Sequence, residues 1–449
     1  MSNTPKESLE PLEAVLTPRH ARWRINIFTI TWLTYAGYYF CRKPFGQAKT
    51  PLSVHMNLSD TELAHIGTGF LVAYMFGQFL TAYLAKRVAC RKLLLVGMAT
   101  SLLSSLALGG IIGNPEEAYE PFVGLMIING LAQGTGWGAC IGIMAHWFTR
   151  SERGTVLAFW ATCYMLGSVF AKALASFMLG LDEVGGIPTT DAIAWMFWAA
   201  GAVLAAIWLL VFFFVKDRPE AYDLPPIVEE EMDIQVQEDR TVSLGWSWDV
   251  KRTVVMMGVA YFCFKFVRYA LDSWAPRLIE QTFGDATDMA GYQAAMFDLA
   301  GFAGVVFAGV VTDRFFRSGR TLLTFVMTIG MCAAVFFMAE LGTSSSTIFV
   351  VGLALTGFML AGPDSLLSGV GSIDVASKRG AVVAAAIING IGSLGAVFQE
   401  QVIGRVLDAS ATKTDAIDNV LMVLIVASLA GAVACYVLVH WKKSGRSSL

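Results

Sequence analysis

Long apolar runs separated by short polar segments dominate the chain. Each run approaches the roughly 20 residues that a helix needs to cross the hydrocarbon core of a bilayer. Transmembrane β-barrels instead show short segments of alternating polarity, so we expect no barrel. The pattern predicts an all-α integral membrane protein with about twelve transmembrane helices. The expected spans lie near residues 25–48, 62–85, 93–113, 121–148, 154–179, 192–215, 252–279, 290–312, 321–341, 347–372, 380–407 and 417–441.

The longest polar interval divides these spans into two groups of six. It is acidic and contains Pro225 and Pro226, a composition typical of a flexible linker. A plain tether explains it better than a regulatory binding segment. We therefore expect a cytoplasmic N-terminal tail (1–22), a six-helix bundle (23–215), a cytoplasmic linker (216–250), a second six-helix bundle (251–441) and a cytoplasmic tail (442–449).

The two halves also repeat each other's motifs. An aromatic-rich run ends in arginine at 38–42 in the first span and at 264–268 in the seventh. Spans five and eleven both open with a basic residue and a glycine, at 153–154 and 379–380. Two homologous six-helix bundles around a central pathway are typical of transporters. The repeat therefore predicts a transporter built from two pseudo-symmetric six-helix bundles.

Composition narrows the function classes. The chain is 55% hydrophobic and only 15% charged, whereas soluble proteins carry about 25% charged residues. A net charge of −3 provides no basic face for nucleic acid. The cysteines show no C-x-x-C spacing and no Ser/His/Asp, H-E-x-x-H or G-x-S-x-G signature occurs. We expect neither an enzyme nor a bound cofactor or metal.

Basic residues orient the chain in the membrane. They concentrate in both tails and in the loops on the same side as the tails, with only Lys49, Arg277 and Lys413 expected on the other side. By the positive-inside rule, both termini are cytoplasmic. Short termini and a compact linker favour a bacterial inner membrane over a eukaryotic organelle membrane. We expect a monomer surrounded by membrane lipid.

A few basic residues fall within the predicted spans, where a charge costs roughly 2.5–3.5 kcal/mol even on the lenient insertion scale. They are Arg42, Lys43, Lys172, Lys265, Arg268 and Arg405. Lys172 and Arg405 lie near outer span ends, so we expect them to snorkel. Arg268 lies near the middle of its span and cannot. Arg42 and Arg268 occupy equivalent positions of the repeat, which predicts a positive pocket between the halves.

Two converging guanidinium groups suit a phosphate dianion better than a single carboxylate. Lys43 and Lys265 add positive charge, and Lys265 shares a helical face with Arg268. Several tyrosines are candidate hydroxyl donors to the ligand, although core packing is an equal alternative for each of them. They are Tyr35, Tyr38, Tyr39, Tyr74, Tyr164 and Tyr269.

Acidic residues within the spans are candidate gating or ion-pair partners. Asp272 lies four residues beyond Arg268, which predicts an intrahelical ion pair. Asp298 and Asp364 are the candidates for a competing hypothesis, proton coupling, and Glu400 lies within span eleven. Asp313 and Arg314, between spans eight and nine, are further candidates for gating.

Four motifs together resemble the organophosphate:phosphate antiporter family of the major facilitator superfamily. They occupy residues 38–45, 134–138, 146–154 and 268–276. The resemblance covers essentially all spans and implies the major facilitator fold. It implies exchange of inorganic phosphate for an organic phosphate ester by alternating access, with Arg42 and Arg268 holding the phosphate. It also places Lys43, Tyr35, Tyr39, Tyr74 and Gln133 in the family's pocket.

The chain departs from this family at several pocket positions. Gln78 stands where span two usually carries a lysine, and Tyr164 where the glycerol-3-phosphate branch has a histidine. The carboxylate before Trp274 is displaced to Asp272 by Ser273. The resemblance therefore predicts the phosphate part of the substrate better than it predicts the organic part. We expect a sugar phosphate or a glycerol phosphate. The alternative functions are a transporter-like sensor of extracellular sugar phosphate and a proton-coupled organic anion symporter.

Overall fold

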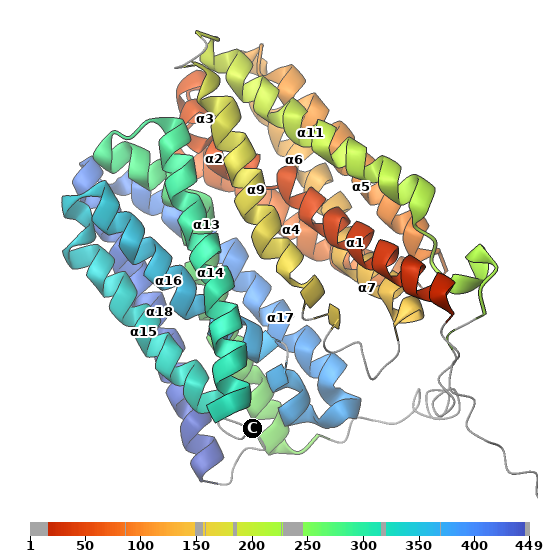
Figure 1. The fold of residues 1–449 in the computed structure, drawn as a ribbon. Coiled ribbons are helices and arrows are strands. Elements are labelled where there is room, and N and C mark those ends of the chain that lie inside the picture. Colours follow the sequence, from red (N-terminus) through yellow and green to blue (C-terminus); the bar gives the residue numbers. More distant parts are fainter. Residues whose placement is uncertain are drawn as a thin grey trace, which may run out of the picture.

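The computed structural model describes residues 17–85, 87–148, 156–157, 159–182, 186–225, 227, 246–315, 320–368 and 370–444. Every regular element within these ranges is a helix, as the apolar pattern predicts (Figure 1). Nine of the helices described are long and apolar enough to cross a membrane. The all-α class is therefore confirmed.

Helices follow one another along the whole described chain. The first half contains α1 (Pro18–Phe40), α2 (Pro44–Gln47), α3 (Lys49–His55), α4 (Asp60–Leu84), α5 (Cys90–Ile111), α6 (Tyr119–Gln133), α7 (Thr135–Trp147), α9 (Thr162–Leu179) and α11 (Thr189–Phe214). The second half contains α13 (Trp248–Phe283), α14 (Thr287–Phe315), α15 (Arg320–Glu340), α16 (Ser346–Ser368), α17 (Val370–Ala409) and α18 (Lys413–Lys443). Short 3₁₀ turns, η1 (Pro115–Glu117), η2 (Pro219–Tyr222) and η4 (Gly342–Ser344), lie between helices.

The first predicted span is not one helix. α1 ends at Phe40 and α2 begins at Pro44. A proline has no backbone N–H to donate to the carbonyl one turn earlier, and its ring clashes with that carbonyl, so the helix is interrupted. Arg42 and Lys43 consequently lie in a turn. By contrast, α13 continues through Pro276, so Arg268 lies within an unbroken helix.

The fourth predicted span is also interrupted, at Gly134 between α6 and α7. A Cβ atom added to Gly134 would lie 2.5 Å from the carbonyl carbon of Gly77 in α4. Only a residue without a side chain permits this approach, which is how small residues allow membrane helices to pack closely. The glycine-rich motif therefore serves helix packing.

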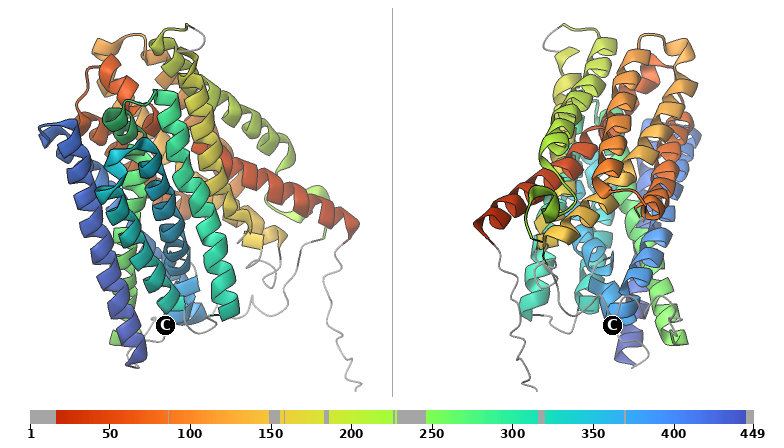
Figure 2. Two further views of the ribbon diagram at one scale, coloured as in Figure 1. Left: turned by 60° about the vertical axis from the view of Figure 1, so that its left-hand side comes forward. Right: turned by 90° about the vertical axis from the view of Figure 1, so that its right-hand side faces the viewer.

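The two groups of helices lie side by side (Figures 1 and 2). Helices α1 to α11 pack mainly against one another, as do α13 to α18. Two extensive helix–helix interfaces join the groups: α4 packs against α17, and α9 packs against α14. α2 and α3 also contact α13. We call the upper end of Figure 1, where α2 and α3 lie, the α3 end of the molecule.

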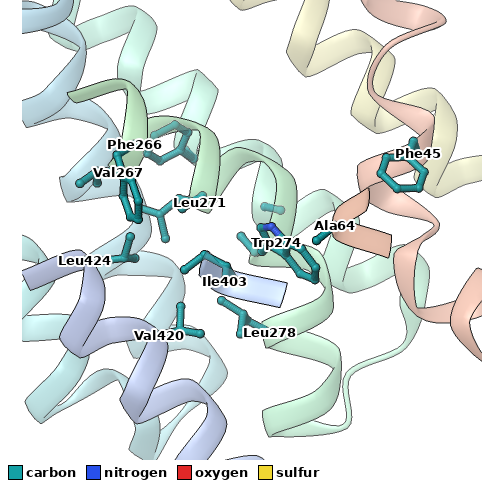
Figure 3. Packing of buried hydrophobic residues seen from close by; sticks show 14 of the residues in the cluster. Phe45, Ala64, Phe266, Val267, Leu271, Trp274, Leu278, Ile403, Val420 and Leu424 are labelled. Carbon is teal, nitrogen blue, oxygen red and sulfur yellow. The ribbon is translucent and has the colours of Figure 1, made fainter. Parts of the chain in front are cut away.

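At the α3 end, the two halves share one apolar core. Phe45 of α2, Ala64 of α4 and Trp274 of α13 belong to the same buried cluster. In Figure 3, Trp274 faces Ala64 across the boundary between the halves. A separate cluster fills the first half alone, around Tyr38, Trp147 and other aromatic residues. Burial of apolar surface thus holds the halves together at the α3 end.

Candidate functional site

Arg42 projects from the turn between α1 and α2 into a cluster of aromatic rings. Its guanidinium carbon lies 4.4 Å from the Tyr74 ring centre and 4.8 Å from that of Tyr39. Its Nε donates a hydrogen bond to Gln133 Oε1 at 2.9 Å. Its Nη2 is buried and has no hydrogen-bond partner among the residues described. A buried donor without an acceptor is costly, and an anion would satisfy it.

Gln133 owes its orientation to neighbouring polar residues. Its side chain is fully buried, and its Nε2 donates hydrogen bonds to Asn129 Oδ1 at 3.1 Å and to Ser101 Oγ at 3.3 Å. With both amide hydrogens directed there, the Gln133 oxygen faces Arg42. Asn129 and Ser101 were not predicted as part of the site.

Arg268 lies across the boundary from this cluster. Its Nη1 donates to Asp364 Oδ2 of α16 at 3.0 Å. Its guanidinium carbon lies 5.2 Å from the ring centre of Tyr164, which belongs to α9 in the other half. The predicted intrahelical pair with Asp272 is wrong. Asp272 instead meets two lysines of the first half, and Asp364 takes its place beside Arg268.

The predicted tyrosines connect the two arginines. Tyr35 and Tyr74 hydroxyls lie 3.3 Å apart, and Gln78, one turn along α4, interacts with the Tyr74 hydroxyl. Tyr39 lies close enough to Arg42 and Arg268 to interact electrostatically with both. The structure therefore gathers the candidate pocket residues of both halves into one region.

Lys43, Lys172, Asp272 and Asp298 form an ion-pair chain between the halves. Asp272 of α13 pairs with Lys43 and, at 2.9 Å, with Lys172 of α9. Lys172 also pairs with Asp298 of α14 at 2.7 Å, and Ser168 donates a hydrogen bond to Asp298. Lys172 is fully buried, so the expectation that it snorkels is wrong. Two carboxylates compensate its charge inside the protein.

Arg405, the other base expected to snorkel, is exposed on α17.

A second set of ion pairs lies at the α3 end and was missed by the sequence. Lys49 of α3 pairs with Glu400 of α17 at 3.0 Å, and Arg277 of α13 pairs with Asp60 of α4 at 2.5 Å. Lys49 is fully buried and Arg277 is 5% exposed, although both were expected outside the membrane. We call these four residues the α3-end latch. The available signal was position, since Lys49 directly follows the predicted span 25–48 and Arg277 falls inside the predicted span 252–279.

Two further contacts support the latch. Asp408 of α17 accepts hydrogen bonds from the backbone N–H groups of Asp60 and Thr61, at 2.9 and 2.7 Å. A carboxylate at the start of α4 is favourable because a helix N-terminus carries partial positive charge. Gly67 permits the approach of Glu400, whose Cδ lies 2.9 Å from the Cβ position of that glycine.

Lys265 has uncharged partners. Its Nζ donates to Asn389 Oδ1 at 2.7 Å and to Ser393 Oγ at 3.3 Å, both on α17. It lies 5.0 Å from the Tyr261 ring centre. Neither Asn389 nor Ser393 was predicted. The side chains of Asp313 and Arg314 lie outside the described part of the structure.

Metal-binding geometry is not found in the part of the chain that the structure describes. No group of three or more His, Cys, Asp or Glu side chains there is arranged to hold a metal ion.

Comparisons with known proteins match this architecture. A sequence model of the family described as "Major Facilitator Superfamily" matches residues 28–399. A glycerol-3-phosphate transporter of Bacillus subtilis (strain 168) is 27% identical, with 87% of each chain covered. A glucose-6-phosphate exchanger of Bos taurus is 26% identical, covering 84% of this chain and 87% of that one. The crystal structure of a D-xylose-proton symporter superposes with a TM-score of 0.73 at 16% identity, covering 92% and 97%, which shows the shared fold.

Proposed function

Because this chain belongs to the major facilitator superfamily, we propose that it exchanges an organic phosphate ester for inorganic phosphate by alternating access. The chain is a multi-pass membrane transporter rather than an enzyme. Its relatives include a glycerol-3-phosphate transporter and a glucose-6-phosphate exchanger, which supports an organic phosphate as substrate. We place it in a bacterial inner membrane with both termini in the cytoplasm.

The buried, unpartnered Nη2 of Arg42 carries the proposal. In this proposal a phosphate group accepts from that donor and from Arg268, which lies on the opposite half. Guanidinium forks match phosphate oxygens in geometry and charge. Tyr35, Tyr39, Tyr74 and Tyr164 surround the same region and supply hydroxyl donors.

Charge within the pathway agrees with an anionic substrate. Five basic residues lie there: Arg42, Lys43, Lys172, Lys265 and Arg268. Asp272, Asp298 and Asp364 are the acids that pair with them in the described structure. Positive charge exceeds negative charge by two, because Arg42 and Lys265 have no carboxylate partner among the described residues, and this excess favours an anionic substrate. An empty site would keep this excess during reorientation, and that favours obligatory exchange.

Alternating access needs an arrangement in which one end is closed. The α3-end latch and the shared apolar core join the halves at that end. With cytoplasmic termini, the α3 end faces outward, so we assign the structure to an inward-facing state. In our proposal the six-helix bundles, 23–215 and 251–441, rock against each other around the bound phosphate.

Exchange in proteoliposomes tests this function. Vesicles loaded with unlabelled phosphate are expected to take up labelled phosphate, whereas empty vesicles are not. Arg268→Ala and Arg268→Lys are both expected to abolish exchange, since lysine keeps the charge but lacks the fork. Arg405→Ala, which removes an exposed arginine, is the control and should exchange normally.

The same experiment separates the alternatives. Full exchange by folded Arg268→Ala would contradict the phosphate site. Binding of phosphate esters without any flux would identify a sensor instead. Uptake that collapses when a protonophore is added would identify a proton-coupled symporter.

A further inference from the structure

Lys265 occupies a place in the pathway that the phosphate site does not require. It is 9% exposed, and its partners Asn389 and Ser393 are neutral. Lys43, Lys49 and Lys172, the other buried lysines of the described structure, each pair with a carboxylate. Lys265 has no carboxylate within ion-pair distance among the described residues. Asp364 is close enough to interact electrostatically with Lys265, but its ion pair is with Arg268. The Lys265 ammonium is therefore held in place by neutral partners.

The helix geometry directs Lys265 toward the boundary between the halves. On α13 it precedes Arg268 by three residues and Asp272 by seven, so the three share one face. That face meets the first half, because Asp272 contacts Lys43 and Lys172 and Arg268 contacts Tyr164.

The α17 partners lie on a matching face. Ser393 precedes Glu400 by seven residues, or two helical turns, and Glu400 contacts Lys49 of the first half. Asn389 precedes Ser393 by one turn and is itself exposed. Lys265, Asn389 and Ser393 therefore continue the pathway from Arg268 toward the end opposite the latch.

We propose that Lys265, Asn389 and Ser393 form a second anion-binding subsite, so that the preferred organic phosphate carries another anionic group such as a carboxylate. The proposal rests on the phosphate site around Arg42 and Arg268. Lys265 supplies the charge, and Asn389 and Ser393 keep the ammonium in position. The Ser393 hydroxyl donates to the backbone carbonyl of Asn389, whereas the Asn389 amide offers an N–H to the ligand. We call these three residues the Lys265 subsite.

Spacing along α13 sets the size of this substrate. Three residues of an α-helix span about 4.5 Å along its axis. A phosphate held by Arg268 and a carboxylate held by Lys265 would thus be separated by a short carbon chain. A three-carbon phosphate ester with a terminal carboxylate meets this requirement. A phosphate ester of similar length whose other end is uncharged leaves Lys265 without an anionic partner, which is unfavourable in a poorly hydrated pathway.

Two probes that differ only at the relevant carbon test the subsite. Glycerol 3-phosphate and 3-phosphoglycerate share a three-carbon skeleton and a phosphate, but the second ends in a carboxylate. In wild-type proteoliposomes, 3-phosphoglycerate is expected to inhibit labelled phosphate exchange at about tenfold lower concentration than glycerol 3-phosphate does. This factor corresponds to one additional hydrogen bond between charged groups. In Lys265→Gln the ratio of the two inhibitory concentrations should fall to near one. Lys413→Gln, at an exposed lysine, is the matched control and should keep it.

A binding measurement separates failure of the subsite from failure of the proposed exchange. Each ester is added to detergent-purified protein, and the shift of the unfolding temperature is recorded. A larger shift with 3-phosphoglycerate that disappears in Lys265→Gln supports the subsite even if no exchange is seen. Equal inhibition and equal shifts by both esters in the wild type overturn it, even if exchange is robust. An unchanged preference in Lys265→Gln overturns it as well.

Discussion

At the scale of single residues, the orientation of Arg42 depends on a neutral amide rather than on a carboxylate. Gln133 accepts from its Nε, and Asn129 and Ser101 hold Gln133. An acidic partner at this position would neutralise the arginine and compete with an anionic substrate. An amide positions the guanidinium and leaves its charge available.

Gln133→Leu is expected to reduce phosphate exchange at least about tenfold, because one hydrogen bond to a charged group is lost and Arg42 can turn away. Gln133→Glu should reduce exchange further, since its carboxylate pairs with Arg42. Initial rates of labelled phosphate exchange measure both effects. A wild-type rate in Gln133→Leu would show that Arg42 needs no such support.

Lys172 shows how a buried charge is stabilised by its partners. It is fully buried between Asp272 and Asp298. Lys172→Met leaves Asp298 buried without its cation, and breaking a buried pair costs about 3–5 kcal/mol. We expect a clearly lower unfolding temperature in detergent.

The double variant Lys172→Met with Asp298→Asn provides the control. It removes the uncompensated carboxylate and should recover part of the lost unfolding temperature. If the double variant is no more stable than Lys172→Met alone, the ion pair is not the source of the stability.

At the scale of elements, the contact between α4 and α17 joins the halves. Gln401 Nε2 donates to Thr68 Oγ1 at 2.8 Å across this contact. In the proposed exchange cycle the two helices must separate whenever the α3 end opens. Their contact is therefore a place where the cycle can be stopped.

A Thr68→Cys, Gln401→Cys pair is expected to be joined by a short thiol cross-linker that contains a disulfide, and exchange should then be lost. A cross-linker is needed because the Gln401 side chain itself spans the gap to Thr68, which is too wide for a direct disulfide. A reductant should restore exchange. Each single cysteine variant treated with the same cross-linker controls for the chain's own free cysteines. Undiminished exchange by the fully cross-linked protein would contradict movement at this contact.

At the scale of the whole molecule, we expect the α3-end latch to set the balance between the inward-facing and outward-facing states of the proposed exchange cycle. Its two ion pairs link α3 with α17 and α4 with α13, so they exist only while the halves meet at that end. Weakening them favours the state in which the α3 end is open.

Asp60→Asn with Glu400→Gln is therefore expected to open the α3 end more often. A cysteine at Thr68 in this background should react with a membrane-impermeant maleimide about tenfold faster than in the wild-type background, which corresponds to a shift of about 1.4 kcal/mol. A cysteine at the exposed Lys413 should react equally in both. Equal rates at Thr68 would show that the latch does not govern opening.

The apolar pattern predicted the helices better than their interruptions. A long apolar run indicates a span regardless of what packs on it, and the helical segments agree with that prediction. The turn at Arg42 and the break at Gly134 depend on Pro44 and on the close approach of α4. Local composition signals such features weakly, because the same residues also occur within continuous membrane helices, as Pro276 does in α13.

By itself, the sequence determined the membrane class, the repeated halves and the unusual arginines, because hydropathy and charge are properties of each segment. Only the tertiary structure decided which partner each charge takes. Arg268 pairs with Asp364 rather than Asp272, and Lys49 pairs with Glu400 from the other half of the chain. An ion pair requires side chains within a few ångströms and shielded from water, and for residues hundreds of positions apart that proximity comes only from the packing of helices.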